Sequence, residues 1–397
     1  MGNRQLSLTS VVAAVLVACA EPVAVRAPAV DARLEAVHFW ESGATVAWNQ
    51  VARDLVVKYT AAIPAIRVYT LLSVAQYNSI IAAEDGKVGA QHPSAGGAVA
   101  GASAAVLTYL YPVEAANLEA LVNQQETTPG WPGAQNDDFA AGEAIGRAVA
   151  AGVITRAQGD GFFAPFLGTV PVCPGCWLAV PTPPAFATLG QARTFFLTSG
   201  DQFRPPPPPA FGSPEFIAAL AEVRQISDTR TPAQDASAKF WAFQLGTFSP
   251  QGYWNKVGSE LAVAYHLGER ETAHVLALMN MAAYDAIVAS HEAKFFYWLI
   301  RPSQADPLIT LSIGLPSFPS YASNHAAVSA ASTTVLGAMF PSERAQLDAQ
   351  AEAAAISRLL GGIHYRFDCD AGLVLGRTIG AYALGHDVVG HEPFVLQ

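Results

Sequence analysis

Two stretches of this chain recur in the same order, and this repetition constrains the fold more than any other feature. Residues 71–83, LLSVAQYNSIIAA, resemble residues 278–290, LMNMAAYDAIVAS. Residues 98–112 resemble residues 327–341, from an Ala/Ser-rich start to an aromatic residue followed by proline. Because both matches keep their order along the chain, we interpret them as an internal duplication rather than a chance similarity of Ala-rich helices. The repeat predicts two related structural units.

Both units are predicted to be helical. Hydrophobic residues make up 51% of the 397 residues and charged residues only 14%, so much of the helical surface must be buried. Ala-rich stretches favour helix, and alternating strand patterns are scarce. Small residues at Ala75, Ala82, Ala282 and Ala289 suit close helix packing within bundles. We therefore predict an all-α chain of two helical bundles.

A Pro-rich tract separates the two units. Residues 171–184 carry no helical period, and Pro205–Pro209 must be extended polyproline II rather than helix. We interpret the tract as a rigid connector. The N-terminal bundle is then expected at residues 30–200 and the C-terminal bundle at residues 210–397.

The N-terminus has the pattern of an export signal. Arg4 precedes an apolar run from Leu6 to Ala18, which is too short to span a bilayer. Residues 16–19, LVAC, resemble the lipobox of a bacterial lipoprotein, in which Cys19 would be lipidated and become the mature N-terminus. An ordinary secretion signal cleaved slightly later is the alternative. Both patterns predict an exported protein with residues 1–19 as leader, located in the periplasm, at the outer membrane or outside the cell.

Three further cysteines are expected to be structural. Cys173 and Cys176 lie in a Pro/Gly-rich loop, where export favours a local disulfide. A redox motif would usually open a helix after a strand, and zinc would need two more ligands nearby, so both alternatives have less support. Cys369 is expected to be a free thiol or a small packed residue.

The formal net charge of −10 argues against a nucleic-acid-binding protein and against a basic membrane-surface protein. Three segments of the second half nevertheless gather cations and imidazoles. In the first segment, Lys294 and Arg301 are about two helical turns apart. We therefore expect them on one face of a helix that ends at Pro302. A solvated helix face is the alternative interpretation.

The second segment leads into a helix predicted at residues 326–339. Ser323 suits the N-cap position, and the free N–H groups of the first turn attract an anion. His325 would then be placed to act as a general acid. A plain capping motif with an incidental histidine is the alternative.

The third segment contains a histidine–carboxylate pair. His364 and Asp368 face the same way if both lie on a helix, so the carboxylate can fix the imidazole tautomer. The other nitrogen is then free to act as a nucleophile or a metal ligand. Arg358 would point away on a straight helix, but Gly361 and Gly362 predict an irregularity that lets it reach the same site.

Taken together, the three segments resemble the signature of the vanadium haloperoxidase and type 2 phosphatidic acid phosphatase superfamily. That signature is Lys-x6-Arg-Pro, then Pro-Ser-Gly-His, then Ser-Arg-x5-His-x3-Asp. The first and third pieces match in full, and the middle piece reads Ala-Ser-Asn-His at residues 322–325. The chain length, the Pro-rich connector and Phe318 are more similar to the haloperoxidase branch than to the short phosphatases.

This resemblance implies a role for each matching residue. His364 would bond the vanadium of vanadate, Asp368 would orient His364, and His325 would be the acid–base residue. His291 and Phe318 would lie near the halide. The oxyanion, vanadate or phosphate, would be held by Lys294, Arg301, Ser323, Asn324 and Arg358.

Two residues of the middle piece depart from the family pattern. Ala322 replaces a proline, and Asn324 replaces a glycine, which matters only if the backbone there needs a positive φ. In the first half, Gly96 aligns with His325 and no Arg-x5-His follows. That half is therefore interpreted as a structural scaffold or a bundle for homodimerisation.

The resemblance implies that the enzyme oxidises a halide with hydrogen peroxide and passes the oxidised halogen to a small organic acceptor. We expect bromide or iodide to be used more readily than chloride. One alternative is an exported acid phosphatase that acts on a phosphomonoester with His364 as the nucleophile. The other is a non-enzymatic, oxyanion-binding lipoprotein, whose mark would be an intact but unreactive pocket.

Overall fold

The computed structural model describes residues 43–86, 92–127, 138–179, 184–243, 246–388 and 392–396. The predicted leader and Cys19 lie outside the described residues, so export and lipidation stay predictions. Within these ranges the chain is all-α, as predicted, and holds isolated β-bridges but no strand. The α-helices are α2 (Ala44–Tyr59), α3 (Ala62–Asp85), α4 (Ala95–Leu110), α5 (Ala115–Thr127), α6 (Phe139–Gln158), α7 (Pro214–Thr229), α8 (Pro232–Phe240), α9 (Ser249–Ala264), α10 (Glu269–Tyr297), α11 (Pro302–Ala305), α12 (Asn324–Met339), α13 (Arg344–Leu360) and α14 (Arg366–Gly385). Three short 3₁₀ helices are η1 (Pro112–Glu114), η2 (Leu189–Gln191) and η3 (Pro341–Glu343).

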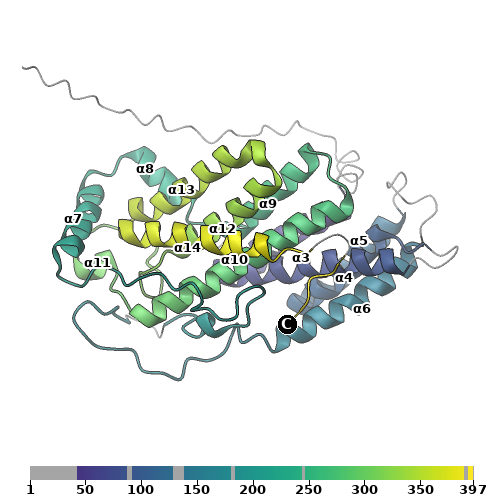
Figure 1. Ribbon diagram of the computed structural model, residues 1–397, viewed down its shortest axis with the longest axis horizontal. Helices are drawn as coiled ribbons and strands as arrows, with labels where there is room; N and C mark the ends of the chain where they lie inside the picture. The colour runs from purple at the N-terminus through teal and green to yellow at the C-terminus, as the bar shows by residue number, and fades with distance from the viewer. Residues whose placement is uncertain are drawn as a thin grey trace, which may run out of the picture.

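Helix α10 forms the centre of the fold. It runs through the middle of the molecule, with α4, α5 and α6 towards one end and α7, α8, α11 and α13 towards the other (Figure 1). Among the described helices, α10 alone is long and apolar enough to cross a membrane, but 94% of its most apolar window is buried inside the protein. One hydrophobic cluster includes Trp48, Val99, Trp254 and Leu336, which come from both halves. The two predicted bundles therefore share a core, and the boundary between them stays a prediction.

A close helix contact occurs at matching positions in the two halves. Helix α6 crosses α4 so closely that a Cβ atom added to Gly146 would lie 2.0 Å from the carbonyl oxygen of Ala98. Helix α14 crosses α12 in the same way, and a Cβ on Gly376 would lie 2.1 Å from the carbonyl oxygen of Ala327. Ala98 and Ala327 are equivalent in the sequence repeat, and only glycine permits such an approach. This matching contact supports the duplication, which itself stays a prediction.

A further match lies outside the repeated stretches found in the sequence. Trp48 and Asn49 on α2 correspond to Trp254 and Asn255 on α9. Both indoles are fully buried. Each asparagine donates from Nδ2 to the carbonyl of the residue four positions earlier, at 2.9 Å in both helices. The shared letters are too few for sequence comparison to detect.

The segment between the halves packs against the second half. Tyr297 Oη donates to the carbonyl of Pro205 at 2.8 Å, and Tyr321 Oη donates to the carbonyl of Pro206 at 2.6 Å.

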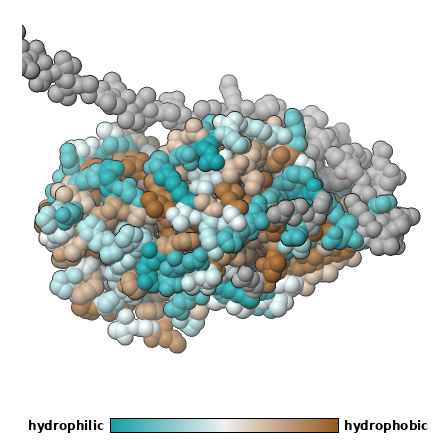
Figure 2. All heavy atoms as spheres, in the orientation of Figure 1, coloured by the Kyte–Doolittle hydropathy of each residue, from teal (hydrophilic) through white to brown (hydrophobic). Residues whose placement is uncertain are grey.

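Cys173 and Cys176 form a disulfide, as their loop predicted, and Cys369 is a buried free thiol. On the face seen in Figure 2, hydrophilic and hydrophobic residues are intermixed.

Asp285 fixes part of this segment from the middle of α10. Its buried carboxylate accepts hydrogen bonds from the backbone N–H groups of Phe195 (2.8 Å), Phe196 (2.7 Å) and Leu197 (3.0 Å). Burial raises the pKa of Asp285 to about 6, although these three hydrogen bonds act to lower it. The carboxylate thus costs stability when it is charged.

We predict that Asp285→Asn changes how stability depends on pH. A carboxyl whose pKa rises from 3.8 to about 6 on folding stabilises the folded state when protonated, and this contribution is lost as the pH rises through that window. A shift of about two units corresponds to about 3 kcal/mol. Urea unfolding at several pH values should show the wild type losing about 3 kcal/mol relative to the variant between pH 4 and pH 7. Parallel stability curves would contradict the prediction.

Candidate active site

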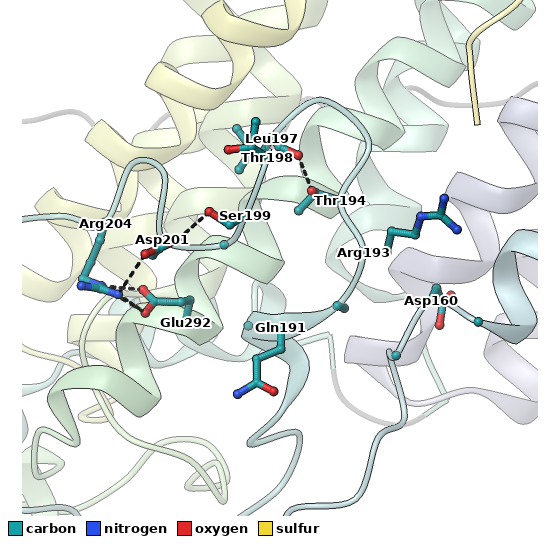
Figure 3. A pocket seen from close by; sticks show the side chains of 15 residues that line it. Asp160, Gln191, Arg193, Thr194, Leu197, Thr198, Ser199, Asp201, Arg204 and Glu292 are labelled. Atoms are coloured by element: carbon teal, nitrogen blue, oxygen red, sulfur yellow. Dashed lines mark hydrogen bonds and ion pairs between the residues drawn. The ribbon is translucent and has the colours of Figure 1, made fainter. Parts of the chain in front are cut away.

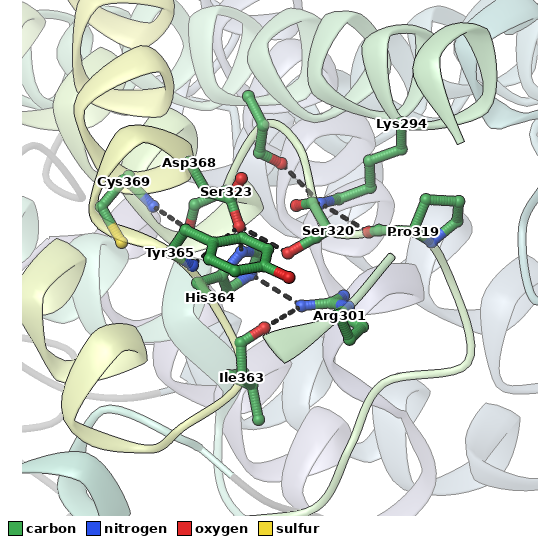
Figure 4. A network of polar contacts seen from close by, with 12 residues as sticks. Lys294, Arg301, Pro319, Ser320, Ser323, Ile363, His364, Tyr365, Asp368 and Cys369 are labelled. Carbon is green, nitrogen blue, oxygen red and sulfur yellow. Dashed lines mark hydrogen bonds and ion pairs between the residues drawn. The ribbon is translucent and has the colours of Figure 1, made fainter. Parts of the chain in front are cut away.

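The three motif segments converge on one region of the second half. A cavity of about 540 Å³ is lined by Asn324 and His325 from α12, Arg358 from α13 and His364 from the following loop. Lys294 and Arg301 lie in the polar network that includes His364 (Figure 4). Residues distant in sequence are thus brought together. The roles assigned to them stay predictions.

The first segment is not a single helix, and this part of the sequence prediction was wrong. Helix α10 ends at Tyr297, and the next residue adopts a left-handed φ of 52°. Pro302 begins α11 instead of ending α10. Between the two helices, Leu299 forms an isolated β-bridge with Cys176 of the disulfide loop. Lys294 therefore projects from the last turn of α10 and Arg301 from an extended segment.

The second segment forms the helix start that the sequence predicted. Helix α12 begins at Asn324, and Ser323 is its N-cap, with its Oγ accepting from the N–H of Ala326 at 3.5 Å. Asn324 is helical and has no positive φ, so its replacement of glycine causes no backbone conflict. Its Oδ1 instead accepts from Ser290 Oγ at 3.0 Å. His325 follows in the first turn and faces the cavity.

The third segment makes the predicted histidine–carboxylate contact, although His364 lies outside a helix. Helix α13 ends at Leu360, and α14 begins after His364 with Asp368 in its first turn. His364 Nδ1 is 2.8 Å from Asp368 Oδ2. Gly362 has a φ of 79°, which provides the expected irregularity between Arg358 and His364.

These contacts define the tautomer of His364. Because Nδ1 faces a carboxylate, it carries the proton and donates a hydrogen bond to Asp368. Nε2 then keeps a lone pair, which accepts from Arg301 Nη1 at 3.0 Å. Asp368 Oδ2 also accepts from Ser320 Oγ at 2.5 Å and from the N–H of Tyr365 at 3.0 Å. The imidazole is thus held with its basic nitrogen toward the cations.

The site buries more positive than negative charge. Lys294 and Arg301 have no exposed surface, and Arg358 is 1% exposed. Within the described part of the chain, none of the three forms a salt bridge. Asp368 is the nearby carboxylate, and its Oδ2 already serves His364 and Ser320. Buried charges without partners are costly, so this region favours a bound anion.

The pKa values of the three cations show the same cost of burying an unpaired positive charge. Burial lowers the pKa of Arg301 to about 10 and the pKa of Arg358 to about 9. Burial and the charge of Arg301 together lower the pKa of Lys294 well below its usual range. Burial and the same cations also lower the pKa of His364, so its imidazole is neutral. An oxyanion among these groups would favour their charged forms.

Lys294 is anchored by the backbone of the second segment. Its Nζ donates to the carbonyls of Pro319 (3.2 Å), Ser320 (2.7 Å) and Ala322 (2.5 Å). An ammonium group has three donors, so all of them are used by these carbonyls. Lys294 must exchange one of the carbonyls before it can donate to an oxyanion.

Three buried nitrogen atoms in or beside the site have no hydrogen-bond partner among the described residues: Arg301 Nη2, His325 Nε2 and His291 Nε2. The ring of His325 makes its other hydrogen bond to the backbone of Trp241, and this bond acts to raise its pKa. A backbone group that favours the charged imidazole is a carbonyl, which can only accept, so the neutral ring of His325 donates to it and Nε2 carries a lone pair. A donor at Arg301 and an acceptor at His325 thus remain available for a ligand that has both oxygen atoms and hydroxyl groups.

The residues present fit an oxyanion such as vanadate or phosphate. Guanidinium and ammonium groups supply donors to oxygen, and His364 Nε2 supplies a lone pair for a bond to the central atom. Within the described ranges, no group of three or more His, Cys, Asp or Glu side chains is arranged to hold a bare metal cation. The donor set therefore suits an anion.

His291 has the wrong polarity for direct contact with a halide. Its Nδ1 lies 3.1 Å from the carbonyl of Ile287 and must donate to it. Burial, followed by the charge of Lys294, lowers the pKa of His291 to about 3, so the ring is neutral and Nε2 presents a lone pair. The ring of Phe318 lies beside it, tilted by 57°, with the two centroids 5.3 Å apart. A lone pair repels an anion, so this polarity does not favour the halide contact at His291, which stays a prediction.

Sequence reasoning missed the groups that position the motif residues. Ser320 holds Asp368, the backbone of Trp241 holds His325, and the carbonyl of Ala238 accepts from Arg358 Nη2 at 2.9 Å. Ser320 lies inside the Pro-rich entry of the second segment, so its position in the motif could have indicated a role in the site. The backbone contacts of Trp241 and Ala238 leave no trace in residue type.

A second cavity, of about 580 Å³, lies elsewhere on the surface (Figure 3). It is lined by the loop at residues 190–204 and by Glu292, whose carboxylate is paired with Arg204. It contains none of the motif residues. We therefore place the candidate active site at the smaller cavity.

Comparisons with known proteins agree with this placement. Residues 273–386 match the sequence model of the PAP2 superfamily. The fold is similar to that of a bacterial vanadium-dependent iodoperoxidase, with a TM-score of 0.74 and 22% identity over 87% of this chain and 96% of that chain. No curated protein sequence matches this chain.

Two structures of bacterial vanadium-dependent chloroperoxidase are also similar. The apo form has a TM-score of 0.66 and 13% identity, covering 80% of this chain and 92% of that chain. The holo form has a TM-score of 0.65 and 14% identity, covering 81% and 91%. Residues 273–386 thus match the PAP2 superfamily, and the chain has the fold of solved vanadium-dependent haloperoxidases, which confirms the resemblance carried by the three motifs.

Proposed function

We propose that this protein is a vanadium-dependent haloperoxidase that oxidises iodide or bromide with hydrogen peroxide. The observation that carries the proposal is the cluster of Lys294, Arg301 and Arg358, which are fully or almost fully buried and have no salt-bridge partner in the described residues. The similarity of the fold to an iodoperoxidase and a chloroperoxidase supports the haloperoxidase branch. The match to the PAP2 superfamily supports an enzyme.

The residues of the cluster divide the work of holding vanadate. Its oxygen atoms would accept hydrogen bonds from Arg301 and Arg358. Lys294 would also donate to them after it releases one backbone carbonyl. Nε2 of His364 would turn from Arg301 to the vanadium, and Asp368 would keep this imidazole in the correct tautomer. The chemistry that vanadate supplies when bound is Lewis-acid activation of hydrogen peroxide.

His325 is placed to move a proton. Its ring is neutral because burial and the charge of Arg358 lower its pKa well below the usual range. Its Nε2 lone pair has no described partner, and the residue lines the cavity. His325 can therefore take the proton of a peroxide that enters the site and return it to the oxygen that leaves.

A phosphatase is the second candidate, and the orientation of His364 supports it as well. A neutral imidazole whose Nδ1 is held by Asp368 presents Nε2 as a nucleophile. The same cations would hold the phosphate, and His325 would protonate the leaving alcohol. The PAP2 match supports this candidate as well.

A paired assay separates the candidates. Purified protein would be supplied with vanadate, peroxide and either iodide or bromide, and in parallel with a phosphomonoester without vanadate. We expect halide oxidation that depends on added vanadate. If vanadate supports no halide oxidation but inhibits turnover of the phosphoester, the phosphatase is correct. Vanadate binding without either activity would leave only an oxyanion-binding protein.

We predict that His364→Ala abolishes the activity, by roughly 10³-fold or more, because it removes the atom that bonds the central atom of the anion. Halide oxidation and phosphoester hydrolysis should both be measured. The matched control is His386→Ala, an exposed histidine whose Nδ1 lies 2.8 Å from the carbonyl of Tyr382. Substantial activity left in His364→Ala would refute the assigned role.

We also predict that Arg358→Met removes the stabilisation that an oxyanion confers. At a vanadate or phosphate concentration 100 times its dissociation constant, the wild type should gain about 2.7 kcal/mol, seen as a rise in Tm. The variant should lose most of this gain. Without anion its stability should equal or exceed that of the wild type, because a buried cation has been replaced by an apolar side chain.

Arg366→Met is the matched control for that experiment. Arg366 is exposed and paired with Glu222 at 2.5 Å, so its loss removes the same charge outside the cavity. The control should keep the full response to anion. An equal loss of response in both variants would mean that the anion binds through the overall charge instead of this site.

We further propose that the protein is exported. The Cys173–Cys176 disulfide supports this location, because disulfides persist in oxidising compartments. The mass of the mature N-terminus distinguishes a lipidated Cys19 from a signal cleaved at a later position. A full-length N-terminus on protein from the native cell would contradict export.

A further inference from the structure

The loop that follows α6 contains no charged residue. Residues 161–179, GFFAPFLGTVPVCPGCWLA, lack Asp, Glu, Lys, Arg and His, although charged residues make up 14% of the chain. The proline tract and its continuation at residues 205–214, PPPPPAFGSP, lack them too. Figure 1 shows the trace between α6 and α7 along the lower margin of the molecule, outside the helices. Exposed apolar runs are unfavourable in water unless they serve a function.

Five large apolar side chains of these two segments are exposed to solvent. Val172 and Leu167 are 98% and 91% exposed, Phe163 is 62% exposed, and Leu178 and Phe211 are about half exposed. A single exposed apolar residue is ordinary, whereas a group of them marks an interaction surface. We call these five residues the apolar face.

Backbone hydrogen bonds fix the loop to the segment that follows α10. The N–H of Trp177 donates to the carbonyl of Trp298 at 2.7 Å, and the N–H of Ile300 donates to the carbonyl of Gly175 at 2.9 Å. The exposed side chains are therefore presented on an ordered support.

Further contacts bring the parts of the apolar face together. The ring of Phe166 lies 6.2 Å from the ring of Trp298, so the first part of the loop shares its support with Trp177. A Cβ atom added to Gly175 would collide with the side chain of Phe211. The two uncharged segments therefore lie side by side.

Two cations beside the apolar face are already paired. The guanidinium of Arg67 lies 5.5 Å from the centroid of the Phe163 ring, but Arg67 is buried and forms a salt bridge with Asp160 at 2.6 Å. Arg204, next to the proline tract, is paired with Glu292 at 2.5 Å. Because each of these cations has its own carboxylate, little positive charge remains here to attract an anionic surface.

We propose that the apolar face binds the surface of a lipid bilayer, and that this surface is electrically neutral, as that of zwitterionic phospholipids is. Burial of the exposed apolar side chains drives the contact. The net charge of −10 and the pairing of the cations oppose binding to anionic headgroups. The backbone of the loop can stay in the hydrated headgroup layer, since only the hydrocarbon region excludes irregular backbone.

The shape of the apolar face favours a bilayer over a second protein chain. Val172 and Leu167 project almost completely from the loop. A protein partner would need a preformed hollow for each of them, because stable protein interfaces are closely packed. Lipid headgroups and acyl chains, in contrast, adapt to projecting apolar side chains.

The bound loop would bring the candidate active site close to the bilayer. The ring of Phe163 lies 6.5 Å from the ring of Phe186. Phe186 and Ile63 of α3 both line the cavity of the candidate active site. That cavity would therefore lie next to the membrane surface.

A vesicle flotation assay tests the contact. The chain from residue 20 onward contains every described residue and lacks Cys19, so a lipid anchor cannot contribute. We expect it to float with phosphatidylcholine vesicles equally well at low and at high salt, because salt screens charges but not apolar contacts. Absence of binding would overturn the proposal. So would binding only to anionic phosphatidylglycerol vesicles that is reversed by high salt.

Charged substitutions locate the contact. In the double variant Leu167→Glu with Val172→Glu, the partition coefficient to the vesicles should fall roughly tenfold or more, because two apolar side chains are replaced by charges that the bilayer excludes. The Tm should not change, since both side chains are exposed in the free protein. Wild-type binding by this variant would overturn the proposal.

The matched control is the double variant Val113→Glu with Val374→Glu. Val113 and Val374 are 77% and 63% exposed and lie outside the apolar face. The control adds the same charge and should keep wild-type binding. An equal loss of binding in both double variants would contradict the proposal, because it would indicate repulsion by the total charge.

Sedimentation velocity without lipid tests a second copy of the chain as the occupant of the apolar face. We expect the same oligomeric state for the wild type and for Leu167→Glu with Val172→Glu. A wild-type dimer that this variant cannot form would assign the face to an interface between copies and refute the lipid contact. Neither measurement involves vanadate or a halide, so failure of this inference would leave the proposed function intact.

Discussion

The candidate site is governed by an excess of buried positive charge. Two opposite unit charges about 4 Å apart attract by about 4 kcal/mol at an effective dielectric constant near 20. Arg358 has no carboxylate to provide that attraction, and Asp368, which acts on Lys294 and Arg301, is already committed to His364. The protein carries a net charge of −10, so the local sign reverses that of the whole molecule. A small oxyanion supplies the missing negative charge and accepts hydrogen bonds from donors that have no partner. One class of ligand therefore accounts for the burial of the cations, their lowered pKa values and the nitrogen atoms without partners.

Maintaining this cluster requires a rigid frame, and the backbone provides much of it. The N–H of Ser323 donates to the carbonyl of Asp368 at 3.0 Å, which ties the second motif to the third. The carbonyls of residues 319, 320 and 322 hold Lys294 from the first motif. Gly376 lets α14 lie directly on α12, so the helix starts that carry Asp368 and His325 stay close. A loss of packing at this glycine would therefore displace Asp368 and His325 of the candidate site, which the glycine does not contact.

The sequence predicted the all-α class, the convergence of the motifs and the pairing of His364 with Asp368, because these depend on residue type and regular spacing. It failed where the backbone leaves regular geometry. Lys294 and Arg301 have helical spacing, yet the chain turns after Tyr297 to pair with the disulfide loop, and such long-range pairing has no periodic signal. The polarity of His291 depends on a carbonyl at 3.1 Å, and the contribution of Ile63 to the cavity depends on how two halves pack. Neither can be derived from local sequence.

The first half contains a helix start similar to the one at the candidate site. Ser94 caps α4 as Ser323 caps α12, so the helix start is present in both halves. One buried network of the first half is neutral, however: Asn49 Nδ2 donates to Gln76 Oε1 at 2.9 Å, and Gln76 Nε2 donates to Ser103 Oγ at 3.0 Å. The buried guanidinium of Arg67 is paired with Asp160 at 2.6 Å. Amides and hydroxyls can be donors and acceptors for one another, whereas lysine and arginine are donors only. Members of a neutral network can therefore bond to one another, while a cluster of cations needs an acceptor of another kind. This difference supports the prediction that the first half is a scaffold and that the second half holds the anion site.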